Sequence, residues 1–251
     1  MTHFFQAIFY QPIFNLLIFL YDAIPGHDLG IAIILLTIII KLVLWPLSNG
    51  ALRSQKALSD IQPKLDALKK EYEGKEKQEE LAKAMMALYS KEKVSPFSSC
   101  LPVLIQLPVF IALYRALSHG LKSNGFEMLY PFVTNPGTIV PSLFGFIDLA
   151  KPNIALALLA GASQYLQAKM MVTRQQPRKT PGAKDEDMLA TMNKQMLYMM
   201  PALTVVLGWK LPGGLALYWL LTNLLTVLQQ KVYFRNADKG PDAAAAAASK
   251  T

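Results

Sequence analysis

Residues 29–47 form a run of mostly apolar residues, and Lys41 is the only formal charge within it. A run of about 20 mostly apolar residues is long enough for a helix to cross the hydrocarbon core of a bilayer. At 100° per residue, Thr37, Lys41 and Ser48 fall on one face of such a helix. This pattern predicts a transmembrane helix with one polar stripe. Alternatively, the Lys41 side chain lies close enough to the end of the run to reach the lipid headgroups.

Four later apolar runs have similar lengths and are separated by polar segments or turn residues. They predict four more transmembrane helices, at residues 97–117, 152–171, 192–209 and 213–231. The connecting segments are residues 118–151, which are rich in Gly, Pro and Asn, and residues 172–191, which are polar and basic. Residues 232–251 form a basic and alanine-rich tail.

Residues 1–28 contain a further apolar and aromatic segment, residues 4–21, which Gln6, Gln11 and Asn15 interrupt. The segment could just span a bilayer, or it could lie along the surface as an interfacial helix. No Lys or Arg precedes Lys41, which argues against a cytoplasmic N-terminus. We therefore predict an interfacial helix on the outer face.

Residues 48–96 have a different composition, with ten basic and eight acidic residues. Within this region, apolar residues recur at alternating spacings of three and four, first at Leu58, Ile61, Leu65, Leu68 and Tyr72, and again at Leu81, Met85 and Leu88. Such spacing is typical of a coiled-coil seam, and Gly74 lies between the two runs. The pattern predicts an antiparallel helical hairpin that projects from the membrane, although a solvated spacer is the simpler alternative.

The basic residues determine the expected orientation. With the 48–96 hairpin on the cytoplasmic side, 20 of the 25 Lys and Arg residues fall on that side and four fall outside. Because cytoplasmic loops are enriched in Lys and Arg, we expect the N-terminus outside and the C-terminus in the cytoplasm. The net charge of +8 then reflects topology and attraction to anionic lipids rather than recognition of nucleic acid.

Composition supports an integral membrane protein, because 53% of the residues are hydrophobic, and the five apolar runs predict an all-α fold with a five-transmembrane-helix core. The single cysteine, Cys100, excludes a disulfide within the chain. No nucleotide-binding loop, nucleophile elbow or metal-ligand spacing is present. We therefore expect no enzymatic activity, no cofactor and no metal.

Several predicted spans carry hydrogen-bonding side chains in addition to Lys41, namely Thr37, Gln106, Gln164, Gln167, Thr222 and Asn223. In membrane proteins such groups usually connect neighbouring helices. In so small a bundle, a lysine together with several amides also suggests a water-containing concavity. The sequence leaves both interpretations open.

Four segments resemble the YidC/Oxa/Alb family of membrane protein insertases. They are IIIKLVLWPLS (38–48), QPKLDALKKEY with MMALYSKEKVSPFSSC (62–72 and 85–100), LPVLIQLPVFIALYRAL (101–117) and LPGGLALYWLLTNLLTVLQQ (211–230). The resemblance implies a five-helix core and a cytoplasmic hairpin between the first two core helices. Because no organelle-targeting segment is recognisable, we expect a bacterial plasma membrane location. Some family members carry an extra N-terminal span and a large periplasmic domain, and we expect neither here.

The resemblance also implies a mechanism. A hydrophilic groove, open to the cytoplasm and to lipid, would accept nascent membrane proteins with short, acidic N-terminal tails. Lys41 stands where bacterial members usually carry arginine, so the charge is kept but the forked guanidinium is lost. Thr37, Phe110, Tyr218 and Trp219 match positions thought to contact the substrate helix, and Gln164 matches by weaker alignment. With Gln106 and Thr222 added from the polar residues of the spans, these form the predicted site.

The Sec translocon and the ribosome are further partners that the family suggests, and the sequence does not decide whether either is needed. Two other functions stay open: a small-solute or ion transporter or channel, with Lys41 as an ion site, and a purely structural assembly factor. Transporters commonly contain repeated halves, and no internal repeat is found in this sequence.

Overall fold

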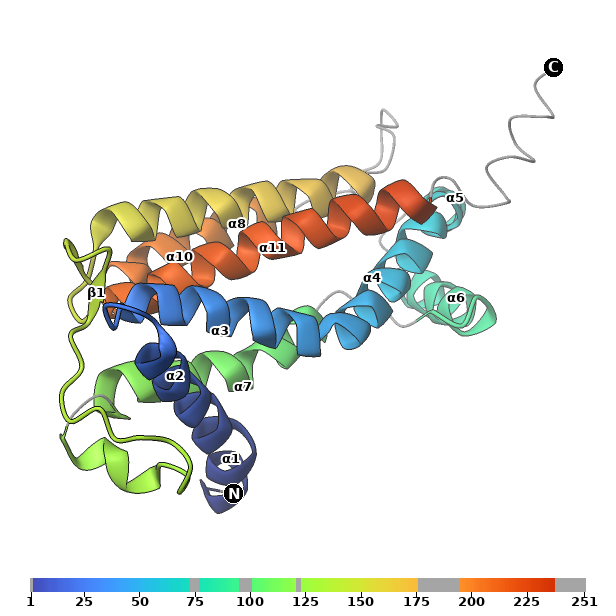
Figure 1. Ribbon diagram of the computed structural model, residues 1–251. Helices are drawn as coiled ribbons and strands as arrows, with labels where there is room; N and C mark the ends of the chain where they lie inside the picture. Colours follow the sequence, from blue (N-terminus) through green and yellow to red (C-terminus); the bar gives the residue numbers. More distant parts are fainter. Residues whose placement is uncertain (1, 73–76, 95–100, 121–122, 176–194, 238–251) are drawn as a thin grey trace.

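The computed structural model describes residues 2–72, 77–94, 101–120, 123–175 and 195–237, and nearly all of its regular structure is helical. The long helices are α3 (Leu29–Val43), α7 (Leu101–Arg115), α8 (Ile154–Gln175) and α11 (Gly213–Ala237). The shorter α10 (Met200–Gly208) follows a π-helical turn at Gln195–Met199. These five helices run side by side in Figure 1. The all-α fold class predicted from the sequence is therefore confirmed.

The close packing of α8 on α10 depends on small residues. A Cβ atom on Gly161 of α8 would lie 2.4 Å from Val205 Cγ2 of α10, and one on Gly208 of α10 would lie 3.0 Å from Ala157 Cβ of α8. Such small residues let two helix backbones approach closely, which is how apolar helices associate within lipid. On its other side α8 packs against α11, and α11 in turn packs against α3.

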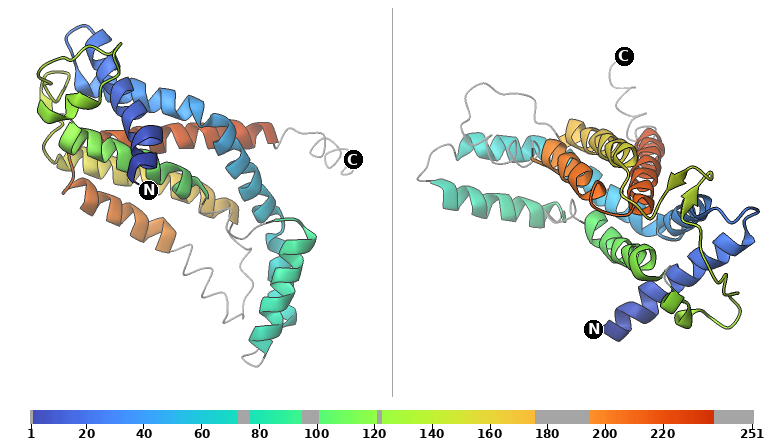
Figure 2. Two further views of the ribbon diagram at one scale, coloured as in Figure 1. Left: turned by 90° about the horizontal axis from the view of Figure 1, so that it is seen from below. Right: turned by 90° about the vertical axis from the view of Figure 1, so that its left-hand side faces the viewer.

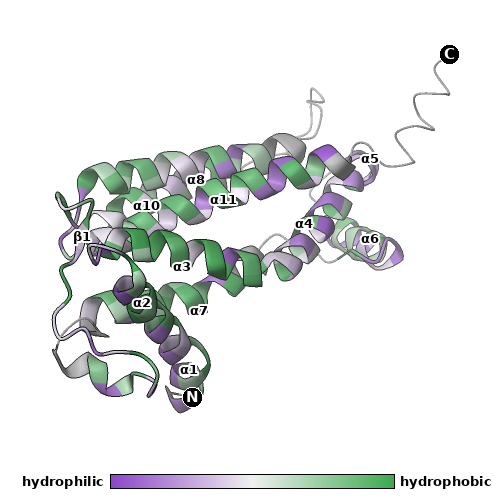
Figure 3. Ribbon diagram, in the orientation of Figure 1, coloured by the Kyte–Doolittle hydropathy of each residue, from purple (hydrophilic) through white to green (hydrophobic). Residues whose placement is uncertain are grey.

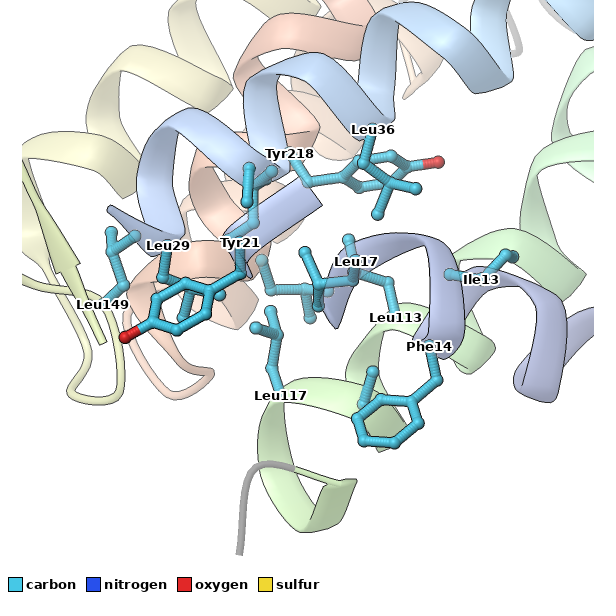
Figure 4. Packing of buried hydrophobic residues seen from close by; sticks show 14 of the residues in the cluster. Ile13, Phe14, Leu17, Tyr21, Leu29, Leu36, Leu113, Leu117, Leu149 and Tyr218 are labelled. Carbon is cyan, nitrogen blue, oxygen red and sulfur yellow. The ribbon is translucent and has the colours of Figure 1, made fainter. Parts of the chain in front are cut away.

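The main hydrophobic core lies at one end of this bundle. It contains fully buried side chains from four helices, among them Leu17 of α2, Leu36 of α3, Leu113 of α7 and Tyr218 of α11. Figure 4 shows these side chains pointing toward one another. The core fixes the positions of α3, α7 and α11, which carry most of the predicted site.

The N-terminal segment is one continuous helix composed of α1 (Thr2–Phe5), a π-helical turn (Gln6–Tyr10) and α2 (Gln11–Ala23). It runs obliquely across the axes of the other helices, and it is seen side-on where α7 and α8 are seen nearly end-on (Figure 2). By length and composition, His3–Ala23 is apolar enough to cross a membrane. Length therefore does not decide between the spanning and interfacial alternatives.

Among the described residues, the same test of length and composition identifies at most one more span, the bent pair Leu29–Val43 and Trp45–Leu68. Helices Leu104–Ser118 and Leu197–Gly208 are apolar but shorter. Helices occupy all five regions that the sequence predicts to span the membrane, but the five spans themselves stay a prediction.

The helix that begins at Leu29 ends earlier than predicted. It stops at Val43, and α4 (Trp45–Asp60) continues at an angle of 62°. Pro46 explains the break, because proline lacks the N–H that would bond to the Leu42 carbonyl, and its ring clashes with that carbonyl. Ser48 consequently lies on the second helix, and the expectation that it continues the Thr37 and Lys41 stripe is wrong.

The charged region contains α4, α5 (Gln62–Glu71) and α6 (Gln78–Lys91), and α5 packs along α6. Ile61 and Leu65 of the predicted seam are buried, and the Lys64 ammonium lies 2.6 Å from the Glu92 carboxylate. Figure 3 shows hydrophilic residues concentrated on these helices, whereas α3, α7 and α10 are mainly apolar. Gly74 lies outside the described residues, and the cytoplasmic position of the region stays a prediction.

Residues 123–153 fold over the end of the bundle that carries the core. They include a 3-10 turn (Ser123–Met128) and an antiparallel pair, β1 (Ser142–Leu143) and β2 (Ile147–Asp148). The Gly213 and Gly214 amides at the start of α11 donate to the carbonyls of Lys151 and Leu149 at 2.9 and 3.0 Å. At the other end, α11 extends to Ala237, six residues beyond the predicted span, so the basic tail begins within a helix.

Candidate functional site

Helix α3 contributes Thr37 and Lys41, which are one turn apart and lie on the same face. Thr37 is fully buried, and its hydroxyl donates to the Ile33 carbonyl at 2.6 Å, within its own helix. The partly buried Lys41 ammonium donates to the Thr226 hydroxyl of α11 at 2.7 Å. In this structure the Lys41 side chain therefore bonds across to a neighbouring helix.

Helices α7 and α11 make the second connection of the site. The Gln106 amide of α7 donates to the hydroxyl of Tyr218, a residue of α11 that is only 1% exposed. One turn further along α7, the Phe110 ring lies 5.1 Å from the Trp219 ring, centroid to centroid, with the planes tilted by 59°. The structure thus brings Gln106, Phe110, Tyr218 and Trp219 together.

The α11 residues that contact Lys41 and Gln106 lie on one face of this helix. Tyr218, Thr222 and Thr226 follow one another at intervals of four, and the Thr226 hydroxyl also donates to the Thr222 carbonyl at 2.6 Å. Asn223 lies on another face, where its amide donates to Ser163 Oγ at 3.1 Å and the Ala160 carbonyl at 3.3 Å on α8. Asn223 therefore connects two helices, whereas the Tyr218–Thr226 face is turned toward α3 and α7.

Gln164 differs from the other predicted site residues. It lies on α8, and its side-chain oxygen accepts a hydrogen bond from the Thr204 hydroxyl of α10. None of the hydrogen bonds described for it reaches Lys41, Gln106 or Tyr218. The structure therefore does not unite Gln164 with the rest of the site.

A group of amide side chains that the sequence did not single out continues the polar face of α11. Gln229 donates to Asn49 Oδ1 of α4 at 3.0 Å. Gln55 Nε2 of α4 and Gln230 Oε1 are buried without a hydrogen-bond partner among the described residues. Because Gln229 and Gln230 lie three and four residues after Thr226, helical spacing was the signal that could have identified them.

The electrostatics of the site depend on Lys41. Within the described residues, the ion pairs are Lys56–Asp60, Lys64–Glu92 and Lys151–Asp148, and none involves Lys41. The hydrogen-bond partner of its ammonium is a neutral hydroxyl. The described residues also contain no group of three His, Cys, Asp or Glu that could hold a metal ion. The site can therefore attract an anionic group.

Comparison with known proteins adds two findings. The model of the family described as 60Kd inner membrane protein matches residues 19–240. Among curated proteins, the membrane protein insertase YidC of Pelobacter propionicus is 35% identical over 222 residues, which cover 88% of this chain and 37% of that protein. The membrane protein insertase YidC of Syntrophobacter fumaroxidans is 35% identical over 218 residues, with 84% and 35% covered.

The chain thus spans little more than a third of the length of these two relatives. Another relative is nearer to it in length. The membrane protein insertase YidC 1 of Halalkalibacterium halodurans is 31% identical over 226 residues, which cover 89% of this chain and 76% of that protein.

Proposed function

Because the chain belongs to the 60Kd inner membrane protein family, in which its relatives are membrane protein insertases, we propose that it inserts nascent membrane proteins into a bacterial inner membrane. The observation that carries the mechanism is the Lys41 ammonium, held between α3 and α11 by a neutral hydroxyl. An ammonium without a carboxylate beside it is free to pair with an anionic group that arrives from outside the chain. The proposed clients have short, acidic N-terminal tails.

The energetic problem that the site would address is the transfer of a charged tail. Moving one charge across hydrocarbon costs from a few to more than ten kcal/mol. A polar surface within the membrane shortens the apolar path, and a fixed cation offsets part of the cost of removing the anion from water. Lys41, Thr226 and the amides of Gln229 and Asn49 form a line of polar groups that could supply such a surface.

We propose that this line lies in a groove open to the cytoplasm and to lipid, and closed on the outer side. Closure is supported by the 123–153 segment, whose carbonyls accept the amides of Gly213 and Gly214. The lateral opening is supported by α7, on which Leu104, Leu107 and Ile111 are exposed beside Phe110. An apolar client helix could leave along these residues, driven by burial of about 25 cal/mol per Å² of apolar surface.

The proposed partners follow from the same argument. Nascent membrane proteins are the clients, and anionic lipids are attracted by the basic hairpin region. The Sec translocon and the ribosome are proposed on the family resemblance alone. Insertion driven by burial and electrostatics requires no nucleotide, so we propose no enzymatic turnover.

The test is insertion into liposomes that contain only the purified full-length chain. The client is a single-span protein with a short acidic N-terminal tail, and insertion is scored by protease protection of that tail. Lys41→Ala should lower protection by about tenfold, which corresponds to about 1.4 kcal/mol, and Lys41→Arg should restore most of it. Lys41→Glu should be the weakest variant because it repels the tail.

A matched client, in which the acidic residues of the tail are replaced by Asn and Gln, separates charge from folding. All Lys41 variants should insert this client about equally well. Full protection of the acidic tail by Lys41→Glu would disprove the electrostatic mechanism. Insertion of neither client by the wild-type chain, even with the Sec translocon added, would contradict the proposed function.

A further inference from the structure

The turn between β1 and β2 exposes two large aromatic side chains. Phe144 and Phe146 are 60% and 76% exposed, and their ring centroids lie 6.1 Å apart. Phe144 has a φ of +53° and Gly145 has a φ of +80°. A left-handed conformation is unfavourable for a bulky residue, and such positions usually carry Asn, Asp or Gly. The turn thus presents two phenylalanines where a water-exposed turn would carry small polar residues.

The turn is fixed at the level where α3 begins. The Phe144 amide donates to Asp28 Oδ2 at 2.5 Å, and Asp28 Oδ1 accepts from the Ile31 amide at 2.9 Å as the N-cap of α3. Leu143 packs so closely on α3 that a Cβ atom on Gly30 would lie 2.3 Å from Leu143 Cδ1. Figure 1 shows β1 beside the start of α3. If α3 spans the membrane, the turn therefore lies at the boundary between water and hydrocarbon.

Other residues at this end of the bundle are of the types that are common at the membrane–water interface. Trp209, at the end of α10, is 62% exposed. The Lys151 side chain is exposed and lies 2.9 Å from Asp148, and the hydrogen bond between them lowers the pKa of the Asp148 carboxyl. Trp is enriched at the level of lipid headgroups, lysine side chains reach that level, and Phe lies on the apolar face of segments bound there.

We propose that the Phe144–Gly145–Phe146 turn is an anchor that places its two rings in the headgroup region of the outer leaflet. The partner is a lipid surface, because the exposed aromatic residues come from separate elements at one level rather than from a single patch. Through Asp28 and Leu143, the anchor fixes the depth at which α3 begins. This inference rests on the part of the proposed function that places α3 across the membrane.

The test uses the full-length chain in lipid nanodiscs, with Cys100→Ser and a single new cysteine carrying an environment-sensitive fluorophore. Phe146→Cys reports on the turn, and Lys83→Cys, an exposed charged position on α6 that the proposed topology places in water, is the control. Lipids that carry a quencher near the headgroup should quench the label at position 146 about two- to threefold more strongly than lipids that carry the quencher at the end of the acyl chain. The label at position 83 should be quenched by neither lipid.

Equal and weak quenching at positions 146 and 83 would overturn the proposal, since the turn would then face water or a protein partner. A second variant tests whether the rings cause the anchoring. Phe144→Asn tolerates the left-handed conformation, so the turn is kept, and quenching at position 146 should fall. Unchanged quenching would contradict anchoring by the rings. The quenching experiments do not measure client insertion. A negative quenching result with normal insertion would therefore contradict the anchor and leave the proposed function intact.

Discussion

The Thr226 hydroxyl holds the Lys41 ammonium at 2.7 Å and thereby directs the charge of α3 toward α11. Thr226→Val keeps the shape of the side chain but removes this hydrogen bond, and a hydrogen bond to a charged group is worth about 1.5–3 kcal/mol. We expect insertion of the acidic-tailed client to fall several-fold in Thr226→Val and to remain near wild type in Thr226→Ser. The liposome assay measures both variants. If Thr226→Val and the wild-type chain inserted the client equally well, the position of the Lys41 ammonium would not depend on Thr226.

Asn15 is the second polar side chain whose surroundings make a clear prediction. It is buried, its amide donates to the Gln11 and Met128 carbonyls at 2.8 and 3.0 Å, and its oxygen accepts from the Tyr130 amide at 2.6 Å. Asn15→Leu leaves these loop groups without their partner at a cost of about 1–3 kcal/mol. The midpoint of thermal unfolding in detergent should fall accordingly. Gln11→Met, which removes one exposed hydrogen bond, is the control and should change stability by less than about 0.5 kcal/mol.

At the scale of residues, the sequence was sufficient to find polar groups in apolar runs, but not to pair them. Lys41 and Gln106 stood out in this way, Tyr218 came from the family resemblance, and the structure brings Gln106 onto Tyr218. Gln164 had the same signal, yet it bonds to Thr204 on α10. Which amide faces which helix depends on how α8, α10 and α11 pack, and no local pattern encodes that.

At the scale of elements, two glycines in helices should respond to the same substitution with opposite signs. In Gly161→Ala the new Cβ would lie 2.4 Å from Val205 Cγ2 and 3.2 Å from the Pro201 carbonyl, so the Val205 side chain or the two helix backbones must shift. Overpacking of this kind costs about 1–3 kcal/mol. Gly50 lies in α4 with nothing within 4 Å of the added atom, so Gly50→Ala should stabilise by about 0.5–1 kcal/mol.

Thermal unfolding of the two variants in the same detergent checks this prediction. A loss of stability in Gly50→Ala would mean that α4 has a neighbour that the structure does not contain. An unchanged midpoint for Gly161→Ala would mean that the interface between α8 and α10 is looser than the contact distances indicate.

Helices could be located from the sequence because apolar runs and seams of period three to four are local signals. Ile61 and Leu65, which belong to the predicted seam, are buried as expected. The ends of helices were less accurate. The chain bends at Leu44 because of Pro46, and α11 continues to Ala237 because its last turns lie against α4, through contacts such as Gln229 with Asn49. The bend was visible in the sequence as Pro46, but its angle of 62° depends on the packing of α4.

At the scale of the whole molecule, the two ends of the bundle differ in chemistry. One end carries the hydrophobic core and the loop that covers it, and the other carries the buried amides and the charged helices α4, α5 and α6 (Figure 3). The distribution of Lys and Arg predicts that the charged end faces the cytoplasm. The N-terminal helix then decides the remaining part of the topology, because a span would put residue 3 on the cytoplasmic side and an interfacial helix would not.

The contacts of the N-terminal helix favour the interfacial alternative. Gln6 and Gln11 bond to Met128, and the Tyr21 hydroxyl accepts from the Val140 amide at 3.1 Å. The Arg115 guanidinium, at the end of α7 next to this loop, lies over the Phe5 ring at 5.6 Å from its centroid. Contacts with the segment that covers one end of the bundle are therefore spread along the helix from Gln6 to Tyr21. A helix that crossed the membrane would have only one of its ends at that level.

This argument predicts the labelling of single cysteines, introduced with Cys100→Ser, by a membrane-impermeant maleimide. His3→Cys and Thr134→Cys should react in intact spheroplasts, and Lys83→Cys of α6 should react only in inverted membrane vesicles. All three positions are exposed, so lack of reaction reports on sidedness rather than on burial. If His3→Cys, like Lys83→Cys, were labelled only in inverted vesicles, residues 4–21 would span the membrane. If the maleimide labelled Thr134→Cys and Lys83→Cys from the same side of the membrane, the predicted topology as a whole would be contradicted.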